Sequence, residues 1–79
     1  MEVRLKFMGI LGNEMPTTIE LEEGTDLRGL IKAMEKKYSA EIMNIVRESA
    51  FLVNKSKVEP TRILKDKDEV MILSVLGGG

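Results

Sequence analysis

Apolar side chains alternate with charged ones at the start of the 79-residue chain, and this pattern constrains the fold more than any other feature. Val3, Leu5 and Phe7 alternate with Glu2, Arg4 and Lys6, and a period of two predicts a strand with one buried face. Residues 69–75 near the end are mostly apolar and predict a last strand, with Val70 and Ile72 on one face and the next residues of the run on the other. The strand side chains that we expect to face the core are Val3, Leu5, Phe7, Val53, Val70 and Ile72.

The period changes between these two strands. Residues 17–21 alternate after a segment with two glycines and a proline, which predicts a hairpin with the first strand. Residues 27–38 instead carry apolar side chains every three or four positions, the pattern of one helix face. Thr25 is a candidate N-cap, and Asp26 would lie in the first turn. Gly29 costs helix propensity, which close packing of helix on sheet or simple tolerance would explain.

The second half of the chain completes the pattern. Ser39 can cap a short second helix, residues 50–53 form a short apolar run, and residues 54–57 read as a turn. The first and last strands can be parallel neighbours, because the connection between them is long enough for a crossover. This order predicts an α+β fold of the β-grasp, ubiquitin-like type. We expect a mixed sheet of 4–5 strands packed against one long helix and a short second helix.

Composition excludes several classes of function. The chain has no Cys and no His, which excludes disulfides, zinc–cysteine sites and histidine acid–base catalysis. Its formal net charge of −1 argues against direct binding of nucleic acid. The chain contains no apolar run of about 18 residues, so we expect no membrane segment and a cytoplasmic location. The acidic clusters at 20–23 and 66–69 are best read as a solvated edge and a turn, with no metal site and no bound cofactor.

Three glycines, Gly77, Gly78 and Gly79, follow the last strand directly. Glycine has no Cβ and loses the most entropy on ordering, so we expect a β-grasp domain at 1–76 and a flexible tail at 77–79. A frayed terminus would also explain the tail. The functional interpretation is a terminal carboxylate on a thin arm that can enter a channel too narrow for side chains.

The chain resembles the ubiquitin-like sulfur carriers of the MoaD and ThiS type, and their relatives the ubiquitin-related and small archaeal modifiers. The resemblance covers the whole length and rests on segments in a fixed order: 19–25 leading into 27–31, then 53–54, 64–70 and the terminal Gly-Gly. The segment at about 36–49 adds a second helix, which is more similar to MoaD than to ThiS.

Two positions depart from that resemblance. Lys67 stands between acidic residues where the family often has Gly, and a positive φ there would strain it. Ser74, Val75 and Leu76 stand where MoaD-like proteins often have prolines, which is more similar to the ubiquitin-related modifiers.

The resemblance implies a mechanism centred on the Gly79 carboxylate. A carboxylate is ionised at neutral pH and resists nucleophiles, and the chain has no phosphate-binding loop of its own. An activating enzyme of the ubiquitin-activating class would therefore use ATP to adenylate Gly79. Sulfur from a persulfide donor would then give a thiocarboxylate. The chain would be the non-catalytic small subunit beside a large catalytic subunit of molybdopterin synthase, or would serve another sulfur acceptor.

A partner needs a face to dock on. Once the inward positions are assigned, Leu52, Met71, Leu73 and Val75, together with Met8, are left on the outer face of the sheet. Clustered exposed apolar side chains mark partner sites, whereas scattered ones are ordinary. The alternative functions are a modifier conjugated to lysines, a sulfur donor for tRNA thiolation or thiazole synthesis, and a plain binding module.

Overall fold

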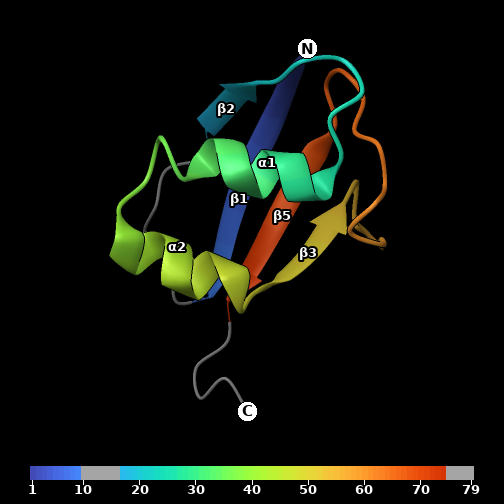
Figure 1. The fold of residues 1–79 in the computed structure, drawn as a ribbon. Coiled ribbons are helices and arrows are strands. Elements are labelled where there is room, and N and C mark those ends of the chain that lie inside the picture. The colour runs from blue at the N-terminus through green and yellow to red at the C-terminus, as the bar shows by residue number, and fades with distance from the viewer. Residues whose placement is uncertain (10–16, 75–79) are drawn as a thin grey trace.

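A five-stranded sheet carries two helices on one of its faces (Figure 1). The computed structural model describes residues 1–9 and 17–74. In chain order the elements are β1 (Glu2–Gly9), β2 (Thr17–Glu20), α1 (Leu27–Met34), α2 (Ala40–Arg47), β3 (Ala50–Val53), β4 (Ser56–Lys57) and β5 (Glu69–Ser74). This is the predicted α+β, β-grasp fold, with five strands.

The sheet has the strand order β2-β1-β5-β3-β4. β1 and β5 are parallel neighbours at its centre, and every other pair is antiparallel. Parallel neighbours require a crossover, and the chain between β1 and β5 carries both helices across the same face. The predicted hairpin of the first two strands and the predicted parallel pairing of the first and last strands are both confirmed.

The core lies between the sheet and the helices. All six strand residues predicted to face inward are at most 4 % exposed, so the period-two interpretation is confirmed. The helices contribute Leu27, Leu30, Met34, Met43 and Val46. Burial of these apolar surfaces is the main driving force for folding. No helix in the described ranges is long and apolar enough to cross a membrane.

Helix α1 is shorter than the sequence predicted. It spans eight residues, the same length as α2, so the expectation of one long helix is wrong, whereas the short second helix is confirmed. The backbone N–H groups of Lys37 and Tyr38 both donate to the Met34 carbonyl, which tightens the chain after the last turn. Tyr38 still packs against the core, its ring 5.7 Å from that of Phe7 in an edge-to-face contact.

The start of α1 corrects two further expectations. The N-cap is Asp26, whose Oδ1 accepts the Gly29 N–H at 2.9 Å, while the Thr25 hydroxyl donates backwards to the Glu22 carbonyl at 2.7 Å. The hydrogen bond from Gly29, and then that from Arg28, lower the pKa of Asp26. A Cβ on Gly29 would first meet Thr25 Cγ2 at 2.7 Å, so this glycine relieves crowding at the N-terminus of the helix and not against the sheet. Ser39 caps α2 as predicted.

Three residues in turns of the second half of the chain have left-handed backbone conformations. Asn54 and Lys55 have φ of 51° and 69° between the antiparallel strands β3 and β4, the geometry of a two-residue type I′ hairpin. Lys67 has φ of 72°, so the positive φ considered from the sequence is present.

Asp68 is the buried polar centre of this region, at 6 % exposed. It accepts hydrogen bonds from Asn54 Nδ2 at 2.9 Å, Arg62 Nη1 at 3.2 Å and the Lys65 N–H at 2.8 Å. Burial alone would raise the pKa of Asp68, but these donors outweigh burial and lower it. The carboxylate thereby ties the β3–β4 turn and the segment before β5 together.

Candidate docking face and carrier tail

The sheet face away from the helices gathers most of the predicted docking residues. Met8 on β1 is the Cα partner of Leu73 on β5, and Leu52 on β3 is the Cα partner of Met71 on β5. Partners on neighbouring strands share a face, so these four side chains form one patch. Val75, the fifth predicted member, lies outside the described residues. We call Met8, Leu52, Met71 and Leu73 the docking face.

The side chains of the docking face do not contribute to the hydrophobic core. Met8 is 39 % exposed, and the other three members are half-buried. None of them belongs to the core cluster or packs against it, whereas the neighbouring Phe51 does pack against it. Flexible methionine side chains suit an adaptable contact surface.

Cations beside the docking face were not singled out from the sequence. Arg4 and Lys6 precede Met8 on the same face of β1, and Lys57 lies on the edge strand β4 opposite Leu52. All three residues are exposed. The alternation in β1 that predicts an outward Met8 also predicts outward Arg4 and Lys6 side chains. The two cations could therefore have been identified from the sequence. Lys57 could not be found this way, because its strand has only two residues.

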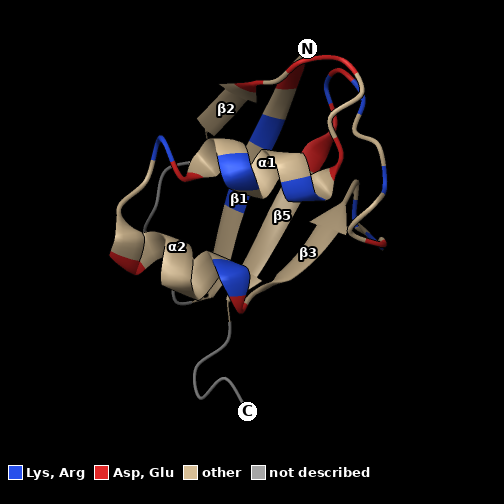
Figure 2. Cartoon of the chain, in the orientation of Figure 1, with Lys and Arg blue, Asp and Glu red and all other residues tan. Residues whose placement is uncertain are grey.

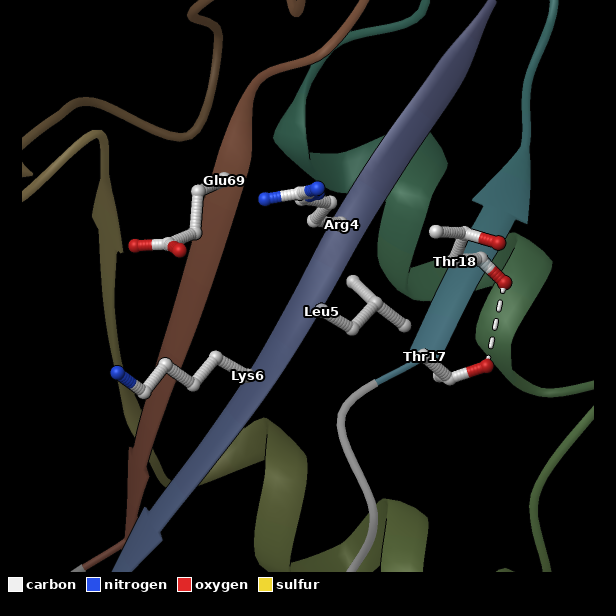
Figure 3. Close-up of a pocket in the computed structure, with 6 residues that line it drawn as sticks. All are labelled: Arg4, Leu5, Lys6, Thr17, Thr18 and Glu69. Atoms are coloured by element: carbon white, nitrogen blue, oxygen red, sulfur yellow. Dashed lines mark hydrogen bonds between the residues drawn. The ribbon is translucent and has the colours of Figure 1, made fainter.

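A groove of about 280 Å³ runs along β1 beside these cations. It is lined by Arg4, Leu5, Lys6, Thr17, Thr18 and Glu69 (Figure 3). In the close-up, the Lys6 side chain extends from β1 across β5, and the Arg4 side chain points from β1 towards β5, where Glu69 lies. Both point away from the two threonines on β2. The polar groups therefore do not converge on a small ligand, and we read the groove as the rim of the docking face.

The end of β5 lies beside the docking face, and the three glycines follow this strand in the sequence after two further residues. Ser74 is the last described residue and is 2 % exposed. Its hydroxyl donates to the Met8 carbonyl at 2.9 Å, and its backbone pairs with Gly9, which has φ of 84°. A Cβ on Gly9 would overlap the Ser74 carbonyl, so this close approach requires glycine. We call this arrangement the Gly9–Ser74 clasp.

The tail itself, Gly77 to Gly79, lies outside the described residues. At about 3.3–3.6 Å per residue, the five residues after Ser74 can extend at most about 18 Å. This length, measured from Ser74, is therefore the upper limit on how far residue 79 can lie from the end of β5.

Figure 2 shows many of the acidic residues near the chain's N-terminus, at the end of the sheet opposite the end of β5. Within residues 1–9 and 17–74 they form no group of three or more that could hold a metal ion.

A family model described as the ThiS family matches residues 6–79, nearly the whole chain. The chain belongs to the ThiS family. It is a MoaD/ThiS-like β-grasp protein of the ubiquitin-like sulfur carrier or modifier type. A search of curated proteins returns no significant match.

Solved structures agree with this placement. A Pyrococcus furiosus protein assigned as molybdopterin converting factor subunit 1 has a TM-score of 0.76 and 25 % identity, over 95 % of this chain and 98 % of that one. A Helicobacter pylori complex of subunits 1 and 2 of the molybdopterin-converting factor matches with a TM-score of 0.74 and 24 % identity, over all of both chains. Urm1 from Trypanosoma brucei matches with a TM-score of 0.75 and 21 % identity, over 99 % of this chain and 95 % of that one. The last two likenesses show the shared fold alone.

Proposed function

We propose that this protein is a sulfur carrier whose Gly79 carboxylate becomes a thiocarboxylate, and that it serves molybdopterin synthesis as the non-catalytic partner of a larger subunit. The observation that carries the proposal is the family match, which extends through the terminal glycines to residue 79. The choice of pathway is supported by the likeness to the two molybdopterin-converting factor structures, one of which is described as a complex of subunits 1 and 2.

The chemistry at Gly79 begins with activation. A carboxylate with a pKa near 3.5 is anionic at neutral pH and repels nucleophiles. One of its oxygens attacks the α-phosphorus of ATP on an activating enzyme, which forms an acyl adenylate and releases pyrophosphate. The mixed anhydride makes AMP a good leaving group, so the carbonyl carbon becomes open to attack.

Sulfur transfer completes the reaction. A persulfide donor supplies the sulfur as sulfide when a thiol reduces the persulfide. The sulfide attacks the Gly79 carbonyl carbon, the C–S bond forms, and the C–O bond to AMP breaks. The product is a thiocarboxylate whose sulfur can attack an acceptor bound to the large subunit. In this mechanism the chain supplies the carboxylate and the docking face, and its partners supply the catalytic groups.

The arrangement supports separate roles for the docking face, which would bind the partner, and for the glycines, which would enter its active site. The docking face lies on the outer side of β5, and the glycines follow this strand after two further residues. Glycines can follow a narrow channel in an enzyme that holds the outer face, because they carry no side chains.

The test is ATP–pyrophosphate exchange with the purified adenylating enzyme of the source organism. We expect exchange with the full chain and none after deletion of Gly78 and Gly79. Deletion of Gly77 alone is the matched control, because it shortens the tail but keeps the Gly-Gly end. Equal exchange by the full chain and the double deletion would overturn the proposal.

A modifier function is the second candidate, supported by the shared fold with Urm1. Both functions use the same adenylate and differ in the nucleophile that follows. Isopeptide remnants of the tail on lysines of other proteins, with no thiocarboxylate on the free chain, would favour the modifier.

A further inference from the structure

One row of the outer face carries a cation at each end. Lys6 pairs with Met71, Met71 with Leu52, and Leu52 with Lys57, so one line across four strands contains cation, apolar, apolar and cation. Strands lie about 4.8 Å apart, which places the Cα atoms of Lys6 and Lys57 about 14 Å from each other. The next row, Met8, Leu73 and Ala50, carries no charge.

Both lysines are available to a partner. Among the described residues neither Lys6 nor Lys57 forms an ion pair, and both are exposed. Arg4 differs because its Cα partner is Glu69, so an opposite charge stands beside it. The chain as a whole has a formal charge of −1, so the positive character belongs to this row and not to the protein in general.

A partner that covers the apolar middle of this row must approach both lysines. A covered ammonium loses hydration, and this loss is offset only where an acceptor or an opposite charge replaces the water. The long lysine stems let the charged ends turn outward around the apolar centre. A neutral or basic rim on the partner would therefore bind poorly, and an acidic rim would bind well.

We propose that the surface covering this face is an apolar patch flanked on two sides by carboxylates, one for Lys6 and one for Lys57, on the adenylating enzyme. The identity of the enzyme rests on the function proposed above, whereas the charge pattern rests on the register of the sheet. Charges at the rim of an interface act on association and on its salt dependence, and like charges placed together are repulsive.

The test uses the full chain and the purified adenylating enzyme of the source organism, with KM and kcat measured by ATP–pyrophosphate exchange. The double variant K6E/K57E should raise KM at least tenfold and leave kcat unchanged. Added salt should raise the KM of the wild type and lower that of the variant. The matched control is K32E/K37E, which changes the net charge equally on exposed residues in and after α1, away from the row. Far-UV circular dichroism checks that both variants are folded.

The outcomes separate the two proposals. Exchange with the wild type, together with equal KM values for the two double variants, would overturn the acidic flanks but leave the carrier function standing. The same would follow if K6E/K57E bound as tightly as the wild type. Absence of exchange with the wild type would overturn the carrier function and, with it, the assignment of this surface to the adenylating enzyme.

Discussion

Replacing Gly9 with alanine tests how the fold holds the end of β5. Gly9 has φ of 84°, where an L-residue costs roughly 1–2 kcal/mol. The new methyl group would also overlap the Ser74 carbonyl, a backbone atom that no side-chain rotation can move away. The last pairing of β1 with β5 must therefore open.

Opening that pairing has its own cost. The Ser74 hydroxyl donates to the Met8 carbonyl at 2.9 Å in a buried position. Losing such a hydrogen bond costs about 1 kcal/mol, and leaving a buried polar group unsatisfied costs about 1–3 kcal/mol. We expect G9A to lower the free energy of unfolding by at least about 3 kcal/mol.

Gly24 provides the matched control. It has φ of 90°, but a Cβ there would meet nothing within 4 Å. G24A should therefore lose only the conformational part, about 1.5 kcal/mol. Urea unfolding followed by circular dichroism measures both variants, and their m-values should match that of the wild type. A loss for G9A no larger than that for G24A would show that the Gly9–Ser74 clasp is not a tight contact.

Three further predictions concern other residues. Asp68→Asn should cost about 2 kcal/mol at pH 7, because the buried carboxylate accepts three hydrogen bonds. Its folded-state pKa is lowered, so this stability is fully present above the unfolded value of about 3.8 and is lost as the pH falls through the folded value. Urea titrations at a series of pH values measure the free energy of unfolding of wild type and variant. If the difference between the two stayed the same at the acid end of the series, it would contradict this prediction. Leu73→Glu should change the free energy of unfolding by less than about 1 kcal/mol and raise the KM for adenylation at least tenfold, and an unfolded variant would refute the outward placement. Lys67→Gly should relieve the positive φ but lose an exposed ion pair with Glu2. Salt screens such a pair, so the urea midpoint of the variant should exceed that of the wild type most clearly in about 1 M salt. An unchanged midpoint in high salt would mean that Lys67 carries no strain.

Local periodicity explains which parts of the fold could be predicted. The alternation around Val3 assigns each side chain of β1 to a face, and the period of two of a strand divides the apolar run from Val70 between the two faces of β5. A slip of one residue in register would expose the core side chains of that strand. Once Val70 and Ile72 are assigned inward, the same period predicts Met71 and Leu73 on the outer face, and the structure places these two residues side by side with Met8 and Leu52.

The missed features depend on contacts between residues far apart in sequence. The bond of Asp68 with Asn54 joins two turns, and the Gly9–Ser74 clasp joins the ends of β1 and β5. The capping error has a local cause. Thr25 and Asp26 can both cap a helix, and the hydroxyl of Thr25 is used by the Glu22 carbonyl.

The central claim is that sulfur is carried on the backbone carboxylate of Gly79. Top-down mass spectrometry of the protein isolated from its native cells, under conditions that prevent hydrolysis, tests it most directly. The account predicts a population heavier by the exchange of one oxygen for one sulfur, with the added mass confined to fragments that contain Gly79. A population modified elsewhere, or a chain that never carries sulfur while the adenylating enzyme is active, would contradict it.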